Sequence, residues 1–223
     1  MLILGVDTSG KNGGLALVRF DAGASQTLEL VSLEGGNFSA QLVRQISDLL
    51  KKHGLSKSDI NGFAAAVGPG SFTGLRVGLA AIKALAEILQ KPIAAVSLLE
   101  AVARGAGRDG KMLAASDAGR GEIYCGEYEI SGAGAKLIAQ QLWSEAEFVT
   151  GAEGRLVVTP DEKIADLARE KKLEVILVPP LRADAIARLG LEKIQAGEVV
   201  TPEALDATYI RRSDAEVMKN SRA

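Results

Sequence analysis

The sequence predicts an α/β protein of two lobes, each a mixed β-sheet flanked by helices. Two observations lead to this prediction. Apolar patterns run in the order strand, strand, strand, helix, strand, helix, strand, helix, and this order starts again after a Gly-rich stretch at residues 105–110. Hydrophobic residues make up 47% of the 223 residues and aromatic residues only 4%, so we expect an aliphatic core sufficient for one large or two small domains.

Three strands are predicted at the start of the chain. Residues 2–7 are almost continuously apolar, as expected for a strand that is buried on both faces. Residues 15–20 and 27–33 follow as two further apolar runs, each after a Gly-containing turn. The three runs therefore predict a meander.

A helix is predicted next, over residues 39–53. Its apolar side chains recur at helical spacing on one face: Leu42, Val43, Ile46, Leu49 and Leu50. We expect Ser39 to be the N-cap and Phe38 to form a hydrophobic staple with Val43. Gly54 is expected to end the helix.

The remaining elements continue the same order. In the first half we expect strands at 63–67 and 93–96, a helix at 74–90 and a helix opened by Ser97 and Glu100. In the second half we expect strands at 112–116, 122–130, 135–142, 155–159 and 174–178, and helices from Ser144 with Glu147, at 161–172 and at 182–195. This order is typical of an RNase H-like half of the actin-like ATPase superfamily. We assign residues 1–106 to the first lobe and 107–223 to a second, degenerate lobe.

Charge and cysteine usage narrow the functional classes. The formal net charge is −2 and no long basic cluster is present, so the chain is not expected to grip RNA by itself. Cys125 is the single cysteine, which excludes an internal disulfide and fits a reducing compartment. No signal-peptide pattern or membrane-length apolar run is seen, so we expect a soluble cytoplasmic protein with no membrane contact.

Residues 68–76, with the sequence GPGSFTGLR, form the most distinctive stretch of the chain. Glycine permits positive φ and close backbone approach, and Ser71 and Thr73 are placed to cap the helix that follows. Free N–H groups at such a helix start can hold an anion or a partner's carbonyl. The loop lacks the GK[ST] ending of a Walker A loop, so a nucleotide site within this chain alone is not indicated.

The candidate catalytic groups are few. Asp7, at the end of the first strand, could help to hold a metal-bound nucleotide, or it could cap its own turn through an Asx hydrogen bond. His53 is the single histidine and is expected to suit the dipole at a helix C-terminus. One histidine and one cysteine supply neither a zinc or iron site nor a nucleophile–base pair, so we predict no metal and no catalytic residue.

Two further features allow a structural and a functional reading. Asp117, Arg120 and Glu122 surround a Gly-rich turn and could form a site, although an ion-pair latch on a hairpin is the commoner arrangement. The helix at 74–90 is rich in glycine and alanine, which would let it pack closely on its own sheet or on a partner helix.

Several segments resemble the TsaB (YeaZ-type) family of bacterial proteins. GPGSFTGLR resembles the family signature, and Ile3–Ser9 resembles its opening strand. Residues 96–101, the 117–124 region and Tyr209-Ile210-Arg211 resemble later blocks in the same order. The chain departs from the family at Phe38, where a histidine is common, and at Arg120, which lies one place later than the usual arginine.

The resemblance implies a non-catalytic pseudoenzyme that supports a TsaD-type paralogue, together with a TsaE-type ATPase, in forming threonylcarbamoyladenosine next to the anticodon of tRNA. It implies no cofactor bound by this chain alone, with ATP and metal on the partners, a homodimer when the chain is alone, and tRNA contact only through the complex. The helices at 39–53 and 74–90 would form the partner interface, through Leu42, Ile46, Gly74, Val77, Gly78, Ala81 and Leu85. The signature loop would comprise Gly68, Pro69, Gly70, Ser71, Phe72, Thr73, Gly74 and Arg76.

A second hypothesis stays open at this point. The chain could be an actin-like ATPase or a sugar-kinase-type enzyme that uses Asp7 and the Gly-rich loop. Magnesium-dependent binding of ATP by the isolated chain would distinguish this enzyme from a non-catalytic subunit.

Overall fold

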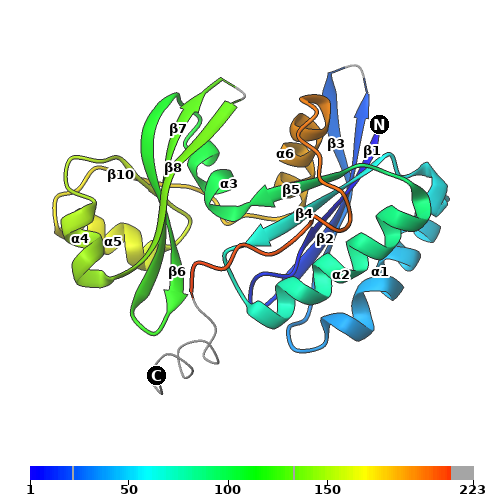
Figure 1. Cartoon of the computed structure of the whole chain (residues 1–223), viewed down its shortest axis with the longest axis horizontal. Coiled ribbons are helices and arrows are strands. Elements are labelled where there is room, and N and C mark those ends of the chain that lie inside the picture. The colour runs from blue at the N-terminus through cyan, green and yellow to red at the C-terminus, as the bar shows by residue number, and fades with distance from the viewer. Residues whose placement is uncertain (22, 133, 212–223) are drawn as a thin grey trace.

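A computed structural model describes residues 1–21, 23–132 and 134–211 of the chain. It consists of two lobes, each with one five-stranded sheet (Figure 1). The α/β fold class predicted from the sequence is therefore confirmed.

The first sheet has the strand order β3-β2-β1-β4-β5. Its strands are β1 (Leu2–Asp7), β2 (Gly13–Asp21), β3 (Ala24–Leu33), β4 (Gly62–Gly68) and β5 (Ile93–Ser97). The meander β1-β2-β3 is antiparallel, whereas β4 runs parallel to both β1 and β5. The sheet is therefore mixed, and its central strands β1 and β4 are almost wholly buried because helices cover both of its faces.

The second sheet repeats this topology, with the order β10-β9-β6-β7-β8. Its strands are β6 (Gly110–Gly119), β7 (Glu122–Ser131), β8 (Gly134–Ser144), β9 (Val157–Thr159) and β10 (Val175–Leu177). β6, β7 and β8 form the antiparallel meander, and β9 runs parallel to β6 and β10. The second half is thus a copy of the first at the level of topology.

Six α-helices lie among the described residues. In the first half they are α1 (Phe38–Lys52), α2 (Phe72–Leu89) and α3 (Leu98–Gly105), with a short 3₁₀ turn η1 (Lys57–Asp59). In the second half they are α4 (Glu145–Gly151), α5 (Glu162–Glu170) and α6 (Ala183–Gln195). α1 and α2 lie side by side on one face of the first sheet (Figure 1).

The third helix of each half lies between the lobes and packs mainly on the other half's sheet. α6 covers the second face of the first sheet, where Ile186 and Ala187 join a core with Ile3 and Val96. α3 places Leu99 and Val102 in the core of the second sheet. The spatial lobes therefore do not follow the division into 1–106 and 107–223, because chain order does not reveal which sheet a terminal helix will cover.

Helix ends agree only in part with the predicted caps. Ser71 and Ser144 accept hydrogen bonds from the backbone N–H groups of Gly74 and Glu147, as predicted. The N-cap of α1 is Asn37, so the prediction of Ser39 was wrong. The predicted staple is also absent, because Phe38 is buried while Val43 is 58% exposed.

No helix among the described residues is long and apolar enough to span a membrane.

Candidate functional site

The Gly-rich loop joins β4 to α2 and packs against the first turn of the chain. Gly68 has φ of +105°, a left-handed conformation that glycine adopts without strain. The N–H group of Ser71 donates a hydrogen bond of 2.6 Å to the carbonyl oxygen of Ser9. A Cβ on Gly70 would lie 2.5 Å from that same oxygen, so this position needs glycine for close approach and not for positive φ.

The small residues at the start of α2 face the chain's own strand β1. A Cβ on Gly74 would lie 2.1 Å from the carbonyl oxygen of Thr8, and a Cβ on Gly78 would lie 2.2 Å from its Oγ1 atom. Gly74 and Gly78 are therefore buried inside the first lobe, where they let α2 approach the end of β1. They are not available on the surface to a partner helix.

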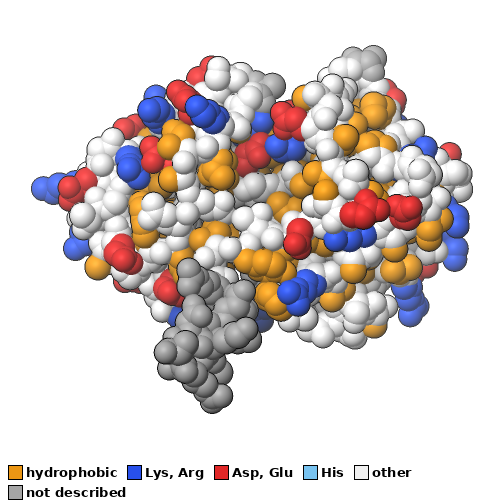
Figure 2. Space-filling view, in the orientation of Figure 1, with side chains coloured by type: hydrophobic (Ala, Val, Ile, Leu, Met, Phe, Trp, Pro, Cys, Tyr) orange, Lys and Arg blue, Asp and Glu red, His pale blue; other side chains and the backbone are white. Residues whose placement is uncertain are grey.

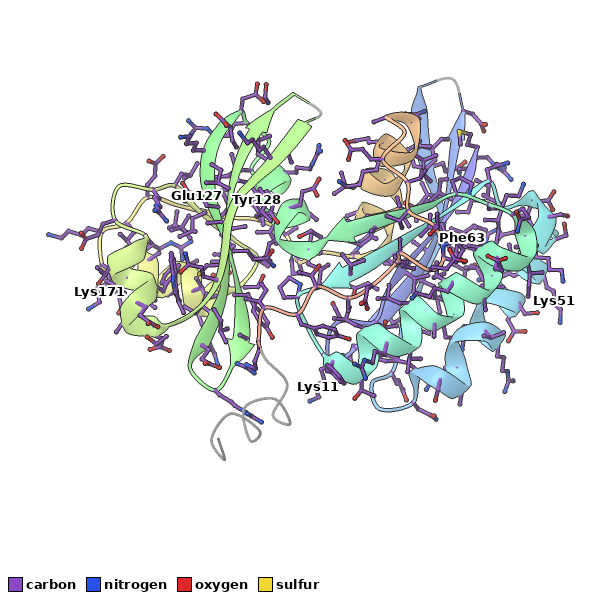
Figure 3. All side chains as sticks on the ribbon, in the orientation of Figure 1. Lys11, Lys51, Phe63, Glu127, Tyr128 and Lys171 are labelled. Carbon is purple, nitrogen blue, oxygen red and sulfur yellow. The ribbon has the colours of Figure 1, made fainter. Side chains whose placement is uncertain are left out.

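The other predicted interface residues divide into two groups. Leu42 and Ile46 on α1 are buried in the first-lobe core, which they share with Phe63 of β4 (Figure 3). Val77, Ala81 and Leu85 on α2 are half-buried at the edge of that core. The outer surface of the helix pair instead presents the following residues: Ala40, Val43, Ala80, Ala84 and Ile88.

A cleft of about 780 Å³ separates the Gly-rich loop from the second lobe. Its walls include Ser9, Gly70 and Lys11 from the first lobe and Asp117 and Tyr124 from the second. Lys11 lies beside the start of α2 (Figure 3). Asp7, the one predicted candidate for holding a nucleotide, is not among the residues that line this cleft.

Asp7 instead stabilises its own turn. Its Oδ1 atom accepts a hydrogen bond of 2.9 Å from the backbone N–H of Ser9. Burial raises the pKa of the Asp7 carboxyl above its usual range, although its hydrogen bonds to Ser9 oppose that rise. This geometry is an Asx turn, which was one of the two roles that the sequence allowed for Asp7.

The polar groups around the β6–β7 turn form a network that reaches the C-terminal segment. Asp117 Oδ1 accepts a hydrogen bond of 2.8 Å from Gly119 N–H, and the backbone N–H of Asp117 donates to Asp161 Oδ2 at 2.9 Å. Burial raises the pKa of Asp161. Glu122 forms an ion pair with Arg211, a partner that the spacing of Asp117, Arg120 and Glu122 did not indicate.

A cluster that sequence reasoning missed lies at the start of α2. The guanidinium carbon of Arg76 is 3.7 Å from the centroid of the Phe72 ring, and its Nε donates a hydrogen bond of 3.0 Å to the hydroxyl of Tyr209. The rings of Phe72 and Tyr209 are 5.0 Å apart. Tyr209 was noticed only as part of a resemblance, because 133 residues separate it from Arg76 in the chain.

His53 and Cys125 both have structural surroundings. His53 Nε2 lies 2.8 Å from Glu29 Oε2, and Lys52 Nζ lies 2.6 Å from Glu29 Oε1. Hydrogen bonds from Lys52 and His53 lower the pKa of Glu29. Burial raises the pKa of Cys125 to about 12, which disfavours the reactive thiolate. Within residues 1–21, 23–132 and 134–211, no group of His, Cys, Asp and Glu side chains is arranged to hold a metal ion.

Comparison with known proteins places this architecture in a family. Residues 33–196, well over half of the chain, match the family model described as TsaD, tRNA N6-adenosine threonylcarbamoyltransferase. The chain is 29% identical to the TsaB protein of tRNA threonylcarbamoyladenosine biosynthesis from Escherichia coli, over 96% of each protein. It is 37% identical to the Bacillus subtilis protein of that name, over 58% of this chain and 56% of the relative.

The chain belongs to the TsaB (YeaZ-type) branch of this family. Solved structures agree on the fold. YeaZ from Pseudomonas aeruginosa has a TM-score of 0.69 and 24% identity, covering 93% of this chain and 99% of that one. A second Pseudomonas aeruginosa structure, of an uncharacterized protein with similarity to peptidase YEAZ, has a TM-score of 0.71 and 24% identity over 94% and 99%. The two lobes, each with one five-stranded sheet, are thus the fold of these Pseudomonas aeruginosa proteins.

Proposed function

We propose that the chain is a non-catalytic subunit in the biosynthesis of threonylcarbamoyladenosine in tRNA. In this proposal it binds a TsaD-type paralogue, which carries the chemistry, and a TsaE-type ATPase joins the assembly. Support comes from the Escherichia coli and Bacillus subtilis relatives, both of which are tRNA threonylcarbamoyladenosine biosynthesis proteins. The match to the family model of a threonylcarbamoyltransferase supports a common ancestor for this chain and that enzyme.

The state of Asp7 carries the non-catalytic part of the proposal. A carboxylate that holds a metal-bound nucleotide must face the cleft, whereas Asp7 is half-buried, does not line the cleft and accepts a hydrogen bond from the backbone N–H of Ser9. Cys125 is buried in the core of the second lobe, and His53 pairs with Glu29. We therefore propose that ATP and metal bind to the partners and not to this chain.

The outer surface of α1 and α2 is the proposed partner surface. Val43 is 58% exposed on α1 and Ile88 is 70% exposed on α2, which are large fractions for aliphatic side chains. Ala80 and Ala84 are also exposed on α2, and such small side chains would let another helix approach closely. We propose that a TsaD-type protein occupies this surface in the cytoplasm and that a second copy occupies it when that partner is absent. In this arrangement tRNA is reached only through the complex.

Charge substitutions on this surface test the proposal. Val43→Glu and Ile88→Glu should each leave the fold intact, because both side chains are exposed, and should abolish co-purification with the TsaD-type protein. Ala81→Arg, at a half-buried site, should weaken binding in the same direction. Ile138→Glu is the matched control, because Ile138 is 44% exposed on β8 of the second lobe.

Two results would contradict the proposal. Unchanged binding by folded Val43→Glu and Ile88→Glu proteins would place the interface elsewhere. Calorimetry that shows tight binding of ATP and magnesium by the isolated chain, lost in Asp7→Asn, would favour an actin-like ATPase or kinase instead.

A further inference from the structure

The C-terminal part of the chain makes a third connection between the lobes. Among the described residues the chain first passes between them at residues 97–98, from β5 to α3, and again at residues 178–183, from β10 to α6. Residues 205–211 then cross once more, as the red segment of Figure 1 shows. We call residues 205–211 the strap.

The strap is fixed to the first lobe at its N-terminal end. Leu205 is fully buried in the core that also contains Val67 and Leu79. The backbone N–H of Thr208 donates a hydrogen bond of 2.7 Å to the carbonyl oxygen of Val67, at the end of β4. This end of the strap therefore moves with the first sheet.

Tyr209 then attaches the strap to α2. Its hydroxyl accepts a hydrogen bond from Arg76, whose guanidinium stacks on Phe72. Tyr209 and Phe72 are each 40% exposed, so this attachment lies on the surface of the molecule. Figure 2 shows hydrophobic side chains at the surface on this face, where the two lobes meet.

The far end of the strap is attached to the second lobe. Ile210 packs against the second-lobe core. The Arg211 guanidinium pairs with the Glu122 carboxylate, donates a bond of 3.4 Å to the Gly119 carbonyl oxygen and lies 6.0 Å from the centroid of the Tyr124 ring. Glu122 and Gly119 flank the β6–β7 turn, so one side chain holds both strands of that hairpin.

The strap lies apart from the other two connections. Residues 178–182 line a separate cavity with Arg104 and Glu192, where α3 meets α6. Residues 208–211 line the cleft beside the Gly-rich loop. The lobes are thus joined at two places, the α3–α6 contact and the strap across the cleft. Without the strap, rotation of one lobe about the α3–α6 contact would widen the cleft.

We propose that the strap is a releasable clasp that sets the angle between the lobes and the width of the cleft. Among the described residues, its attachment to the second lobe consists of half-buried Ile210 and the contacts of the partly exposed Arg211 side chain with Glu122, Gly119 and Tyr124, so it can detach without exposing a core. This device goes beyond the proposed function, and its test does not need a partner protein.

Distance measurements between the lobes test the clasp. Spin labels are placed at Lys57→Cys in the first lobe and Lys163→Cys in the second, both exposed positions, on a Cys125→Ala background of the full chain. Pulsed electron paramagnetic resonance should give one narrow distribution of the distance between the two labels in this otherwise unchanged parent protein. Arg211→Ala and Glu122→Gln should each give a broader distribution, because each removes the ion pair from one side.

Matched variants separate the clasp from a general loss of stability. Arg169→Ala removes an ion pair with Asp166 on α5, remote from the strap, and should leave the distribution unchanged. The exchanged pair Arg211→Glu with Glu122→Arg should narrow the distribution again. Circular dichroism verifies folding of each variant. Parental distributions in both folded Arg211→Ala and folded Glu122→Gln would overturn the proposal.

Discussion

The half-buried carboxyl of Asp7 distinguishes the two proposed functions, because an ATPase site and an Asx turn favour different charge states. Folding raises its pKa, so the ionised form is less favourable in the folded than in the unfolded chain. The contribution of neutral Asp7 is therefore fully present below the unfolded pKa of about 3.8 and is lost as pH rises through the higher folded value. Asparagine has the same shape, can accept the same bond from Ser9 and does not ionise.

We predict that Asp7→Asn melts at the same temperature as the parent near pH 3 and at a higher temperature near pH 7. A gain of about 2–4 °C is expected for each kcal/mol of desolvation that is relieved, given the size of the chain. Thermal melts across this pH range measure it. If Asp7→Asn were instead less stable than the parent at pH 7 only, the carboxylate would have a favourable partner, as an ATPase site requires.

Residue types alone indicated part of this site. The counts of histidine and cysteine predict no metal or nucleophile system, which stays a prediction, whereas the Asx turn allowed by the spacing of Asp7 and Ser9 is present in the structure. The Arg76–Tyr209 and Glu122–Arg211 contacts could not be predicted, because 133 and 89 positions separate the partners and their approach depends on the path of the C-terminal segment. For the Gly-rich loop the sequence allowed both positive φ and close approach, and the structure shows close approach to Ser9 at Gly70 and positive φ at Gly68.

At the scale of an element, α2 has two faces with different tasks. Gly74 and Gly78 lie against Thr8 and make the helix part of the first-lobe core. The family resemblance implied that Gly78 belongs to the partner interface, where a larger side chain would leave the fold intact. The structure corrects that expectation, because composition identifies a small-residue helix but not which of its faces is buried.

We predict that Gly78→Leu destabilises the fold by about 1–3 kcal/mol or more, as overpacked core positions do. Its Cβ alone would lie 2.2 Å from Thr8 Oγ1. Ala84→Leu on the exposed face of the same helix is the control, and it should change stability by no more than about 0.5 kcal/mol. Urea unfolding compares the two midpoints. Equal midpoints would show that α2 can move away from β1 at little cost.

At the scale of the whole molecule, each lobe is completed by a helix from the other half of the chain. Periodicity predicted the positions of the strands and of most helices, since each apolar run is a local signal. It could not predict that α6 returns to the first sheet, because the apolar face of α6 has the same pattern whichever sheet it covers. The topological repeat was likewise visible only as element order.

The last prediction follows from this arrangement. A fragment of residues 1–106, the first lobe as the sequence divides it, should not fold alone, because Ile3, Val18 and Val96 on the second face of its sheet would lose the cover of α6. Residues 1–97 joined by a long Gly/Ser linker to residues 180–208 should fold, since this fusion restores α6 and Leu205 to the first-lobe core. Amide NMR spectra distinguish the outcomes, with dispersed peaks for the fusion and collapsed peaks for the fragment.

The same fusion with Ile186→Asp should not fold, because Ile186 is fully buried against the sheet. Dispersed spectra for fragment 1–106 would mean that α1 and α2 alone sustain the first lobe and that α6 only connects it to the second.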